Sequence, residues 1–368
     1  MNKFEIGLQF FADAGTVVNA TNQYVNAYTG DATSFEEAGK SLSPTMKVFY
    51  DTALLENARP QMFYAQFAKR QPLPLKHGGS VEWRKFDTFA RAEKLTEGVI
   101  PTGQKFGLTK ITGSIDQYGT YTTISDRLEM RAYDPIIMGA TEEMGASGAE
   151  TQEKLIRDAL LVGTNVLYCD NIDPSTGEIA TGAGVVATPT SCAQMEASAT
   201  AMSALTPTMI NKAVTILKRN RVPQINGRYY AVIHPSVAFD LRQNKDWIEA
   251  HKYAAPEQQF NGEIGELHGV RFVENVFAPV LGGDDYKNKA NGVTYATYFF
   301  GKDGFGIIDP EGGGMEMIVK DKGQVGGPLD QFSTVGYKFE TNGATILYQE
   351  RILRVMSCSS FSASDETN

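Results

Sequence analysis

The sequence has few cysteines and histidines, an excess of acidic residues and no long apolar run. Its 368 residues include three cysteines (Cys169, Cys192 and Cys358), four histidines and a formal charge of −9. Widely separated cysteines in odd number indicate free thiols or a reducing compartment, not a disulfide framework. No stretch approaches the roughly 18 apolar residues of a transmembrane helix, so we expect no membrane partner. The acidic balance argues against a protein that grips DNA independently of sequence.

The strong signatures of enzymes and metal sites are also absent. There is no P-loop, HExxH, nucleophile elbow or CxxC pair, and the histidines have no ligand spacing, so we expect no catalytic or metal site and no cofactor. His234, in "VIHPS" after a strand-like run, is the best single candidate for an enzyme site. A histidine that holds the backbone of a loop is the more common explanation of such a position.

The chain opens with a polar stretch, 1–45, that is typical of an extended arm ordered by a partner surface. Ser43 and Pro44 then predict the start of a helix that runs to about Lys69, because serine caps helices and proline fits the first helical position.

Residues 70–115 are predicted to form a long projecting hairpin. Val81–Phe86 and Lys110–Ile115 have strand composition, and a polar, turn-prone segment separates them. Residues 69–94 contain seven basic and three acidic residues, a net charge of +4. The hairpin residues that we expect at a binding surface are Lys76, Trp83, Arg84, Lys85, Arg91 and Lys94.

A strand and a long helix follow. "QYGTYTTIS" alternates with period two, and Asp126 and Glu129 have the spacing of a capping box. Asp134 and Pro135 predict a second helix, over 135–162. At about 100° per residue, its apolar residues form one stripe that faces the body. The opposite face is predicted to be an exposed acidic ridge of Glu142, Glu143, Glu150 and Glu153.

The remaining sequence predicts a connector and a second α/β region. Residues 169–205 are rich in turn-forming residues, and Thr206 with Pro207 begins a helix to about Arg219. A buried strand, a short helix and turn-punctuated strands follow, and Asn342-Gly343 predicts a two-residue hairpin. The mixture of elements indicates an α+β fold.

Several segments are recognisable in their order along the chain. They are "GLQFFAD", "SPTMKVFYDTALLENARPQMFYAQFAKRQPLPLKHGGSVEWRKF", "LTEGVIPTG", "QYGTYTTISD", "RDALLVGTNVLY", "VIHPSVAFDLR", "GELHGVRFVEN" and "GPLDQFSTVGYKF". In this order the chain resembles the major capsid proteins of tailed phages that adopt the Hong Kong 97-type capsid fold. The resemblance spans residues 3 to 356, and its specificity comes from the eight segments in register.

The resemblance implies a role for each part of the chain. The expected parts are an N-terminal arm (1–45), a helix of the body (46–69), an extended loop (70–115), a peripheral domain with the spine helix 135–162 and the connector (116–205), an axial α/β domain (206–330), strands that return to the body (331–357) and a flexible tail (358–368).

It also implies a function and partners. The protein would self-assemble, as hexamers and pentamers, into the icosahedral shell around the double-stranded DNA genome of a tailed phage. It would be made in the host bacterial cytoplasm and end in the virion capsid. Expected partners are a separate scaffolding protein, a portal, a possible decoration protein, and packaged DNA contacted weakly on the inner face. Two alternatives stay open: an encapsulin-like compartment that shares the fold, and an α/β enzyme with a site near His234.

The opposed charges lead to a specific hypothesis about assembly. The basic hairpin of one subunit would dock near the acidic face of the long helix of an adjacent subunit, in a head-to-tail contact. The alternative, two solvated faces that never meet, is equally consistent with composition. No pair of residues for a covalent cross-link is identifiable.

Overall fold

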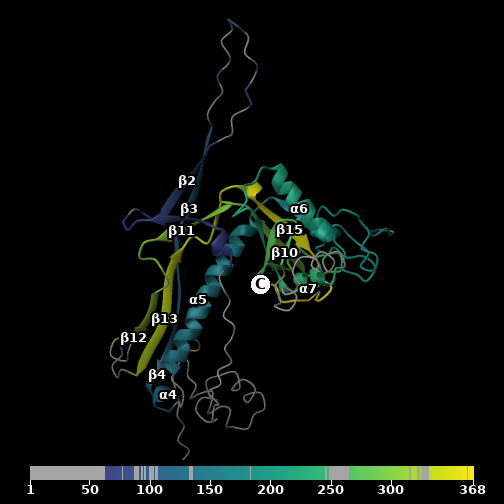
Figure 1. Ribbon diagram of the computed structural model, residues 1–368. Coiled ribbons are helices and arrows are strands. Elements are labelled where there is room, and N and C mark those ends of the chain that lie inside the picture. The colour runs from purple at the N-terminus through teal and green to yellow at the C-terminus, as the bar shows by residue number, and fades with distance from the viewer. Residues whose placement is uncertain are drawn as a thin grey trace, which may run out of the picture. The chain divides into compact units, whose positions relative to one another are not determined.

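The computed structural model describes residues 63–368 with several gaps, and these residues form two compact units (Figure 1). The gaps are 77, 87–90, 93, 95–96, 99–102, 104–106, 132–135, 183, 245–246, 248–264, 315, 321–323, 325–330 and 363. The predicted arm and most of the helix predicted over 46–69 lie outside the described residues. Unit 1 contains described residues of Asp116–Glu150 and Gly312–Thr341, and unit 2 contains those of Pro60–Ile115, Thr151–Glu311 and Asn342–Asn368.

Unit 1 is built on a three-stranded antiparallel sheet in the order β12-β13-β4. Its strands are β4 (Asp116–Ser125), β12 (Glu316–Lys320) and β13 (Phe332–Thr341). At Gly336, a Cβ atom would lie 2.8 Å from the backbone oxygen of Thr120, so glycine is required for the close approach of β13 to β4.

The predicted junction from strand to helix is confirmed. α4 (Asp126–Arg131) begins directly after β4, and Leu128 packs with Ile124 and Val335 in the core of unit 1. α5 (Ile136–Leu161) then matches the predicted helix 135–162 closely. Its residues up to Glu150 cluster with unit 1, and the later ones cluster with unit 2.

Unit 2 is built on a mixed sheet in the order β5-β15-β10-β6-β8-β7, with β9 paired to β10. The strands are β5 (Val166–Tyr168), β6 (Tyr229–Ile233), β7 (Glu266–Leu267), β8 (Val270–Glu274), β9 (Val280–Leu281), β10 (Thr294–Phe300) and β15 (Ile352–Ser357). Every residue of β10 and β15 is buried, as expected for strands that are covered on both faces.

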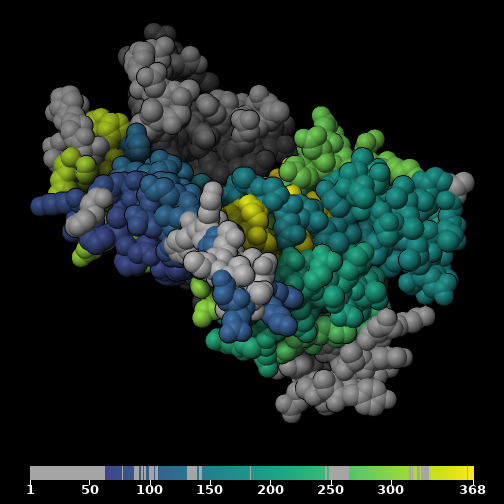
Figure 2. All heavy atoms as spheres, turned by 90° about the horizontal axis from the view of Figure 1, so that it is seen from above, coloured from purple at the N-terminus to yellow at the C-terminus, as the bar shows by residue number. Residues whose placement is uncertain are grey.

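Helices cover the two faces of this sheet. α6 (Pro207–Arg219) and α7 (Pro235–Gln243) pack in one core cluster with Tyr295 and Phe299 of β10. The alternate residues Tyr298 and Phe300 pack in a second cluster with the last turns of α5 and the 3₁₀ helix Tyr64–Phe67. In the space-filling view, yellow atoms of the C-terminal end of the chain lie among the teal and green atoms of unit 2 (Figure 2).

The predicted start of α6 is confirmed in detail. The hydroxyl of Thr206 accepts a hydrogen bond from the amide of Met209 at 3.3 Å, and Pro207 occupies the first helical position. The predicted strand before His234 and the short helix after it are also present, as β6 and α7.

Two smaller sheets complete unit 2. β1 (Lys69–Leu73), β11 (Phe305–Pro310) and β14 (Thr345–Ile346) form one, and β2 (Ser80–Phe86) and β3 (Leu108–Ser114) form the predicted hairpin. The prediction that a helix continues to Lys69 is wrong, because Lys69 begins β1. Proline disfavours helical backbone at the residue before it, here Gln71 and Leu73, and β11 offers β1 a parallel partner.

The hairpin predicted at Asn342-Gly343 is also wrong. β13 before the turn pairs with β4 and β12, whereas β14 after it pairs with β11. Gly343 has a φ of +62°, so the turn residue has the expected conformation. The side-chain oxygen of Asn342 accepts a hydrogen bond from the amide of Ile308 at 2.9 Å. The turn thus directs the chain from one sheet to another.

The last residues differ from the predicted flexible tail. Ser360 and Asp365 hydrogen-bond to residues of unit 2, so this tail is a docked segment. In the described residues of the connector 169–205, regular structure is limited to a short 3₁₀ helix at Cys192–Gln194 and isolated β-bridges, as expected. No helix within the described ranges is long and apolar enough to cross a membrane.

Candidate assembly surface

The hairpin β2–β3 is anchored by Trp83. This side chain is 8% exposed and packs with Ile308 and Leu347. Glycine makes room for the indole, because a Cβ atom at Gly113 or Gly306 would lie 2.8 or 2.9 Å from its ring atoms. Of the predicted surface residues, Trp83 therefore lies inside unit 2, where it fixes the base of the hairpin.

Part of the positive charge of the hairpin is paired within the chain. Glu82 accepts from Arg84 at 3.0 Å and from Lys110 at 2.7 Å. These hydrogen bonds, from Lys110 first and then Arg84, hold the pKa of the Glu82 carboxyl below its usual range. Lys85 lies 3.8 Å from Glu350 and 4.8 Å from the ring centre of Tyr348. Each of these three basic residues, on β2 or β3, already has an acidic partner in the same chain. Their positive charge is therefore partly neutralised before another subunit binds.

Three other basic residues of the predicted surface are exposed. Lys76 lies in the turn before β2 with a φ of +68°, and Arg91 and Lys94 lie beyond the end of β2. Phe86 and Leu108 are directly opposite each other in the register and are 57% and 48% exposed. Arg91 and Lys94 thus add cationic side chains to an outer part of the hairpin that also exposes this apolar pair, and protein interfaces commonly combine the two kinds.

The acidic ridge predicted on the long helix is wrong at Glu153. Glu143 is exposed and Glu150 is half-buried, whereas Glu153 is 1% exposed. The side chain of Glu142 lies outside the described residues. In unit 2, Ile156 and Leu160 are buried and lie within about 60° of Glu153 around the helix. The face of α5 that carries Glu153 is therefore the face that is buried in unit 2.

Hydrogen bonds explain how a carboxylate is buried on this face. One oxygen of Glu153 accepts from the amides of Phe63 and Tyr64 at 3.1 and 3.2 Å and from the side chain of Asn275 at 2.7 Å. Burial raises the pKa of the Glu153 carboxyl, against the opposing effect of these three donors. A buried acid with several donors looks the same in the sequence as an exposed one, which is why the prediction failed.

His234 has the structural role that its sequence context favoured. It caps α7, and its Nδ1 accepts a hydrogen bond from the amide of Ser236 at 3.2 Å. Burial lowers the pKa of His234, and the nearby Asp365 opposes this effect. With one ring nitrogen committed to the helix cap, the geometry is that of a histidine holding backbone, not a ligand set.

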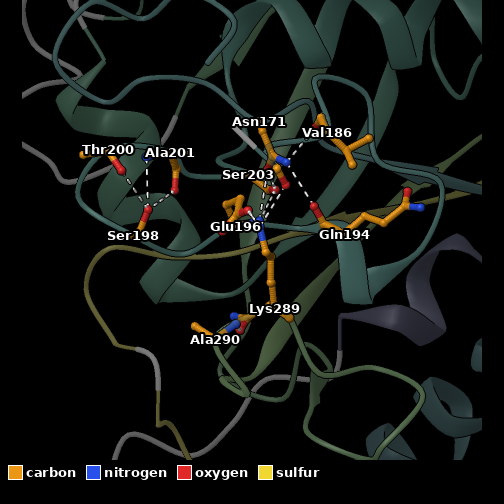
Figure 3. Close-up of polar contacts among 12 residues, drawn as sticks. Asn171, Val186, Gln194, Glu196, Ser198, Thr200, Ala201, Ser203, Lys289 and Ala290 are labelled. Atoms are coloured by element: carbon orange, nitrogen blue, oxygen red, sulfur yellow. Dashed lines mark hydrogen bonds and ion pairs between the residues drawn. The ribbon is translucent and has the colours of Figure 1, made fainter. Parts of the chain in front are cut away.

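The connector contains a polar network that sequence analysis missed. Asn171 donates to the carbonyls of Val186 and Gln194 at 2.8 and 3.0 Å, and its side-chain oxygen accepts from Ser203 and from the amide of Glu196 (Figure 3). Glu196 also pairs with Lys289, which comes from a distant loop. This network orders a segment without regular structure. The only sequence signal was an asparagine three residues after the end of β5.

Within the described ranges, no group of three or more His, Cys, Asp or Glu residues could hold a metal ion. Cys169, Cys192 and Cys358 are buried free thiols, as the sequence indicated.

The comparison with protein families decides the identity of the chain. The model of the family described as "Phage capsid protein" matches residues 109–345, which is more than half of the chain. The chain belongs to the phage capsid protein family. A comparison with curated proteins finds no match to this capsid protein.

Solved capsid structures share the fold of this capsid protein. The head structure of the Helicobacter pylori bacteriophage KHP40 matches with a TM-score of 0.61 and 12% identity, over 88% of this chain and 97% of that chain. The cyanophage Pam1 capsid matches with a TM-score of 0.61 and 14% identity, over 89% and 98%. The capsid of the cyanophage P-SCSP1u matches with a TM-score of 0.59 and 13% identity, over 87% and 95%.

These comparisons confirm the central predictions. The fold is the α+β, Hong Kong 97-type capsid fold, and the protein is a major capsid protein that forms a viral shell. The family and the similar structures are those of structural proteins, which favours a shell component over an enzyme built around His234.

Proposed function

We propose that this capsid protein assembles, as hexamers and pentamers, into the closed icosahedral shell around the double-stranded DNA of a tailed phage. The observation that carries the proposal is the family match over residues 109–345. Individual contacts between subunits can be weak because many are made at once, so a closed shell is stable while errors dissociate. The acidic chain also suits a container, since a strongly basic wall would hold packaged DNA by counterion release.

Electron microscopy of the expressed chain tests this proposal. We expect closed shells of defined diameter that form without an added enzyme or cargo. A small oligomer with a closed pocket would favour an enzyme, and shells filled with a cargo protein, from a locus without phage genes, would favour an encapsulin-like compartment.

The contact between subunits that we propose joins the hairpin β2–β3 to the α5 helix of a neighbouring copy. It is supported by the exposed positions of Lys76 in the turn before the hairpin, of Arg91 and Lys94 beyond the end of β2, and of Glu143 on the helix. Glu153 is excluded from this surface because it is buried. Arg84 and Lys85 contribute less than their charge indicates, since each already has an acidic partner.

Charge reversal tests this contact. Replacing Glu142, Glu143 and Glu150 with lysine should prevent assembly or lower the salt concentration at which shells dissociate, because like charges would then face each other. The matched control carries the same change in charge at exposed loop residues: Glu178→Lys, Asp284→Lys and Asp285→Lys. Equal salt resistance of the two triple variants and of the unaltered shell would rule out the contact.

The expected division into peripheral and axial domains, with the boundaries given above, is part of the same proposal. So are the separate scaffolding protein, the portal, a decoration protein, weak contact with packaged DNA and synthesis in the host cytoplasm. Expression of the chain with and without the neighbouring phage genes, followed by measurement of shell size and closure, tests the need for these partners.

A further inference from the structure

The described residues of the C-terminal segment 359–368, all except 363, lie along α7 of unit 2. The hydroxyl of Ser359 donates to the carbonyl of Ser236 at 2.9 Å, and the amide of Ser360 donates to Asp240 at 2.9 Å. The ring of Phe361 lies 5.1 Å from that of Phe239, edge on. These contacts tie the first half of the segment to one helix.

Asp365 is held in a socket of hydrogen-bond donors. Its Oδ2 accepts from the hydroxyl of Tyr295 at 2.6 Å and from that of Ser236 at 2.8 Å. Tyr295 is completely buried, and Ser236 is 5% exposed in the first turn of α7. The amino-terminal end of a helix favours a nearby anion. The two hydroxyl donors and the start of α7 therefore both favour a negatively charged group at this position. His234 lies against Tyr295, with 5.1 Å between the ring centres.

The segment ends on an edge strand. The side chain of Asn368 accepts from the amide of Val280 in β9 at 3.1 Å and donates to the carbonyl of Ala278 at 3.3 Å. Beside it, a Cβ atom on Gly282 would lie only 2.4 Å from the methyl group of Thr367. The absence of a side chain at Gly282 therefore provides the space in which the segment lies.

A cavity of about 450 Å³ remains beside the docked segment. Its lining includes Phe277 and Val280, and the charged or titratable groups that face it are Lys154, His234, Asp365 and Glu366. The segment therefore occupies only part of a larger groove, between the start of α7 and the loop before β9.

We propose that this groove is a peptide-binding site whose socket recognises a carboxylate, and that the acidic C-terminal segment of the same chain fills it as a detachable strap. The ligand class is a short acidic peptide with an aspartate at the place of Asp365. Phe361 stays 63% exposed, so polar contacts hold the strap more than apolar burial does. The inference concerns unit 2 alone and does not depend on the proposed contact between subunits.

Acid should release the strap. Burial opposes ionisation of Asp365, but hydrogen bonds from Ser362, Tyr295 and Ser236 and the attraction of His234 lower its pKa overall. The pKa of Asp365 is thus lower in the docked segment than in the released one. Docking is therefore strongest above the usual aspartate pKa of about 3.9 and weakens as the pH falls through the lowered value.

Hydrogen exchange of the full chain tests the docking in cis. We expect protected amides in 359–368, and an increase in their exchange of about tenfold or more in the Asp365→Asn variant, which loses a charged acceptor. Tyr295→Phe should have a similar effect, and its effect when added to Asp365→Asn should be smaller than its effect alone, because both changes act on the same hydrogen bond. Glu178→Gln is the matched control, since it removes one negative charge at an exposed position in the connector, outside the groove, and should change exchange by less than about twofold.

A labelled peptide with the sequence of 359–368 tests the groove itself. It should bind saturably to the full chain carrying Asp365→Asn, and the peptide with asparagine in place of Asp365 should bind about tenfold more weakly. Near-ultraviolet circular dichroism establishes that the variant is folded. An unprotected segment in the unaltered chain, equal effects of Asp365→Asn and Glu178→Gln, or equal binding of the two peptides would each overturn the proposal. Competition by a second copy of the chain would show that the strap can also be donated between copies.

Discussion

The side-chain amide of Asn275 donates a 2.7 Å hydrogen bond to the carboxylate of Glu153, 122 positions earlier in the chain. The same oxygen accepts from the amides of Phe63 and Tyr64. One carboxylate therefore joins three segments of unit 2: α5, the loop after β8 and the residues before β1.

Glu153→Ala should lower the free energy of unfolding by about 2–4 kcal/mol, because three donors, two of them buried, lose their acceptor. Glu153→Gln keeps an acceptor of the same shape and should cost about 1 kcal/mol or less. Denaturant-induced unfolding of the unassembled chain measures both. Equal losses in the two variants would contradict the role of the accepting oxygen.

The effect of Glu153→Gln should depend on pH. Because burial raises the folded-state pKa of Glu153, its contribution to stability is largest below the unfolded-state value of about 4.3 and falls as the pH rises through the raised value. Glutamine does not titrate. Relative to the unaltered chain, the variant should therefore be more stable near neutral pH than near pH 4, which unfolding curves at the two pH values will show.

Gly306→Ala should destabilise the base of the hairpin by about 1–3 kcal/mol, since a Cβ atom there would lie 2.9 Å from the ring of Trp83. The displaced indole should change its fluorescence, which is best recorded with the other tryptophan replaced, as Trp247→Phe. Gly79→Ala is the control, because a Cβ atom on Gly79 has no neighbour within 4 Å.

Asn342→Ala should cost about 1–3 kcal/mol, because the amide of Ile308 in β11 loses its acceptor. Asn342→Asp retains an acceptor and should lose less. Amide exchange at Ile308 gives the local measurement. Faster exchange in the alanine variant alone is the expected result, and unchanged exchange in both would refute the importance of this bond.

Glu82→Gln should strengthen the attraction of the hairpin for an acidic partner, because it removes the carboxylate that neutralises Arg84 and Lys110. The effect on folding should be small, since exposed ion pairs contribute little. If the proposed contact forms, shells of this variant should withstand more salt than unaltered shells. Glu178→Gln, at an exposed position in the connector, controls for the change in net charge.

The three thiols should react with a thiol reagent only after unfolding. Burial raises the pKa of Cys358 to about 12 and raises the pKa of Cys169 and Cys192 as well, so little thiolate is present at neutral pH. Titration with a chromogenic disulfide should find no rapidly reacting thiol in the folded chain and all three in denaturant. A fast reaction of the folded chain with the reagent would show that at least one of the cysteines is accessible.

Local patterns predicted the elements whose signals are local. The cap at Thr206 and the strand β4 depend on neighbours within a few residues, and the structure confirms both of them. The patterns failed where a distant partner decides the outcome. Lys69 is in a strand because β11 pairs with it, and Asn342-Gly343 turns the chain between sheets because β13 and β14 have different partners.

The same distinction between local and distant signals applies to the candidate assembly surface. The basic hairpin and the long helix were evident from composition and period, but which side of the helix is buried was not. A carboxylate is expected in water unless donors compensate its burial, and the donors to Glu153 come from residues far away in the sequence.

The sequence by itself determined the class of protein: the order of its recognisable segments and the match to the family identify a capsid protein with an α+β fold. Only the tertiary structure decided that Glu153 is an internal joint, that Asn171 orders the connector and that Asp365 docks the tail. Each of these roles depends on hydrogen bonds between residues far apart in the chain, and their geometry exists only after the chain has folded.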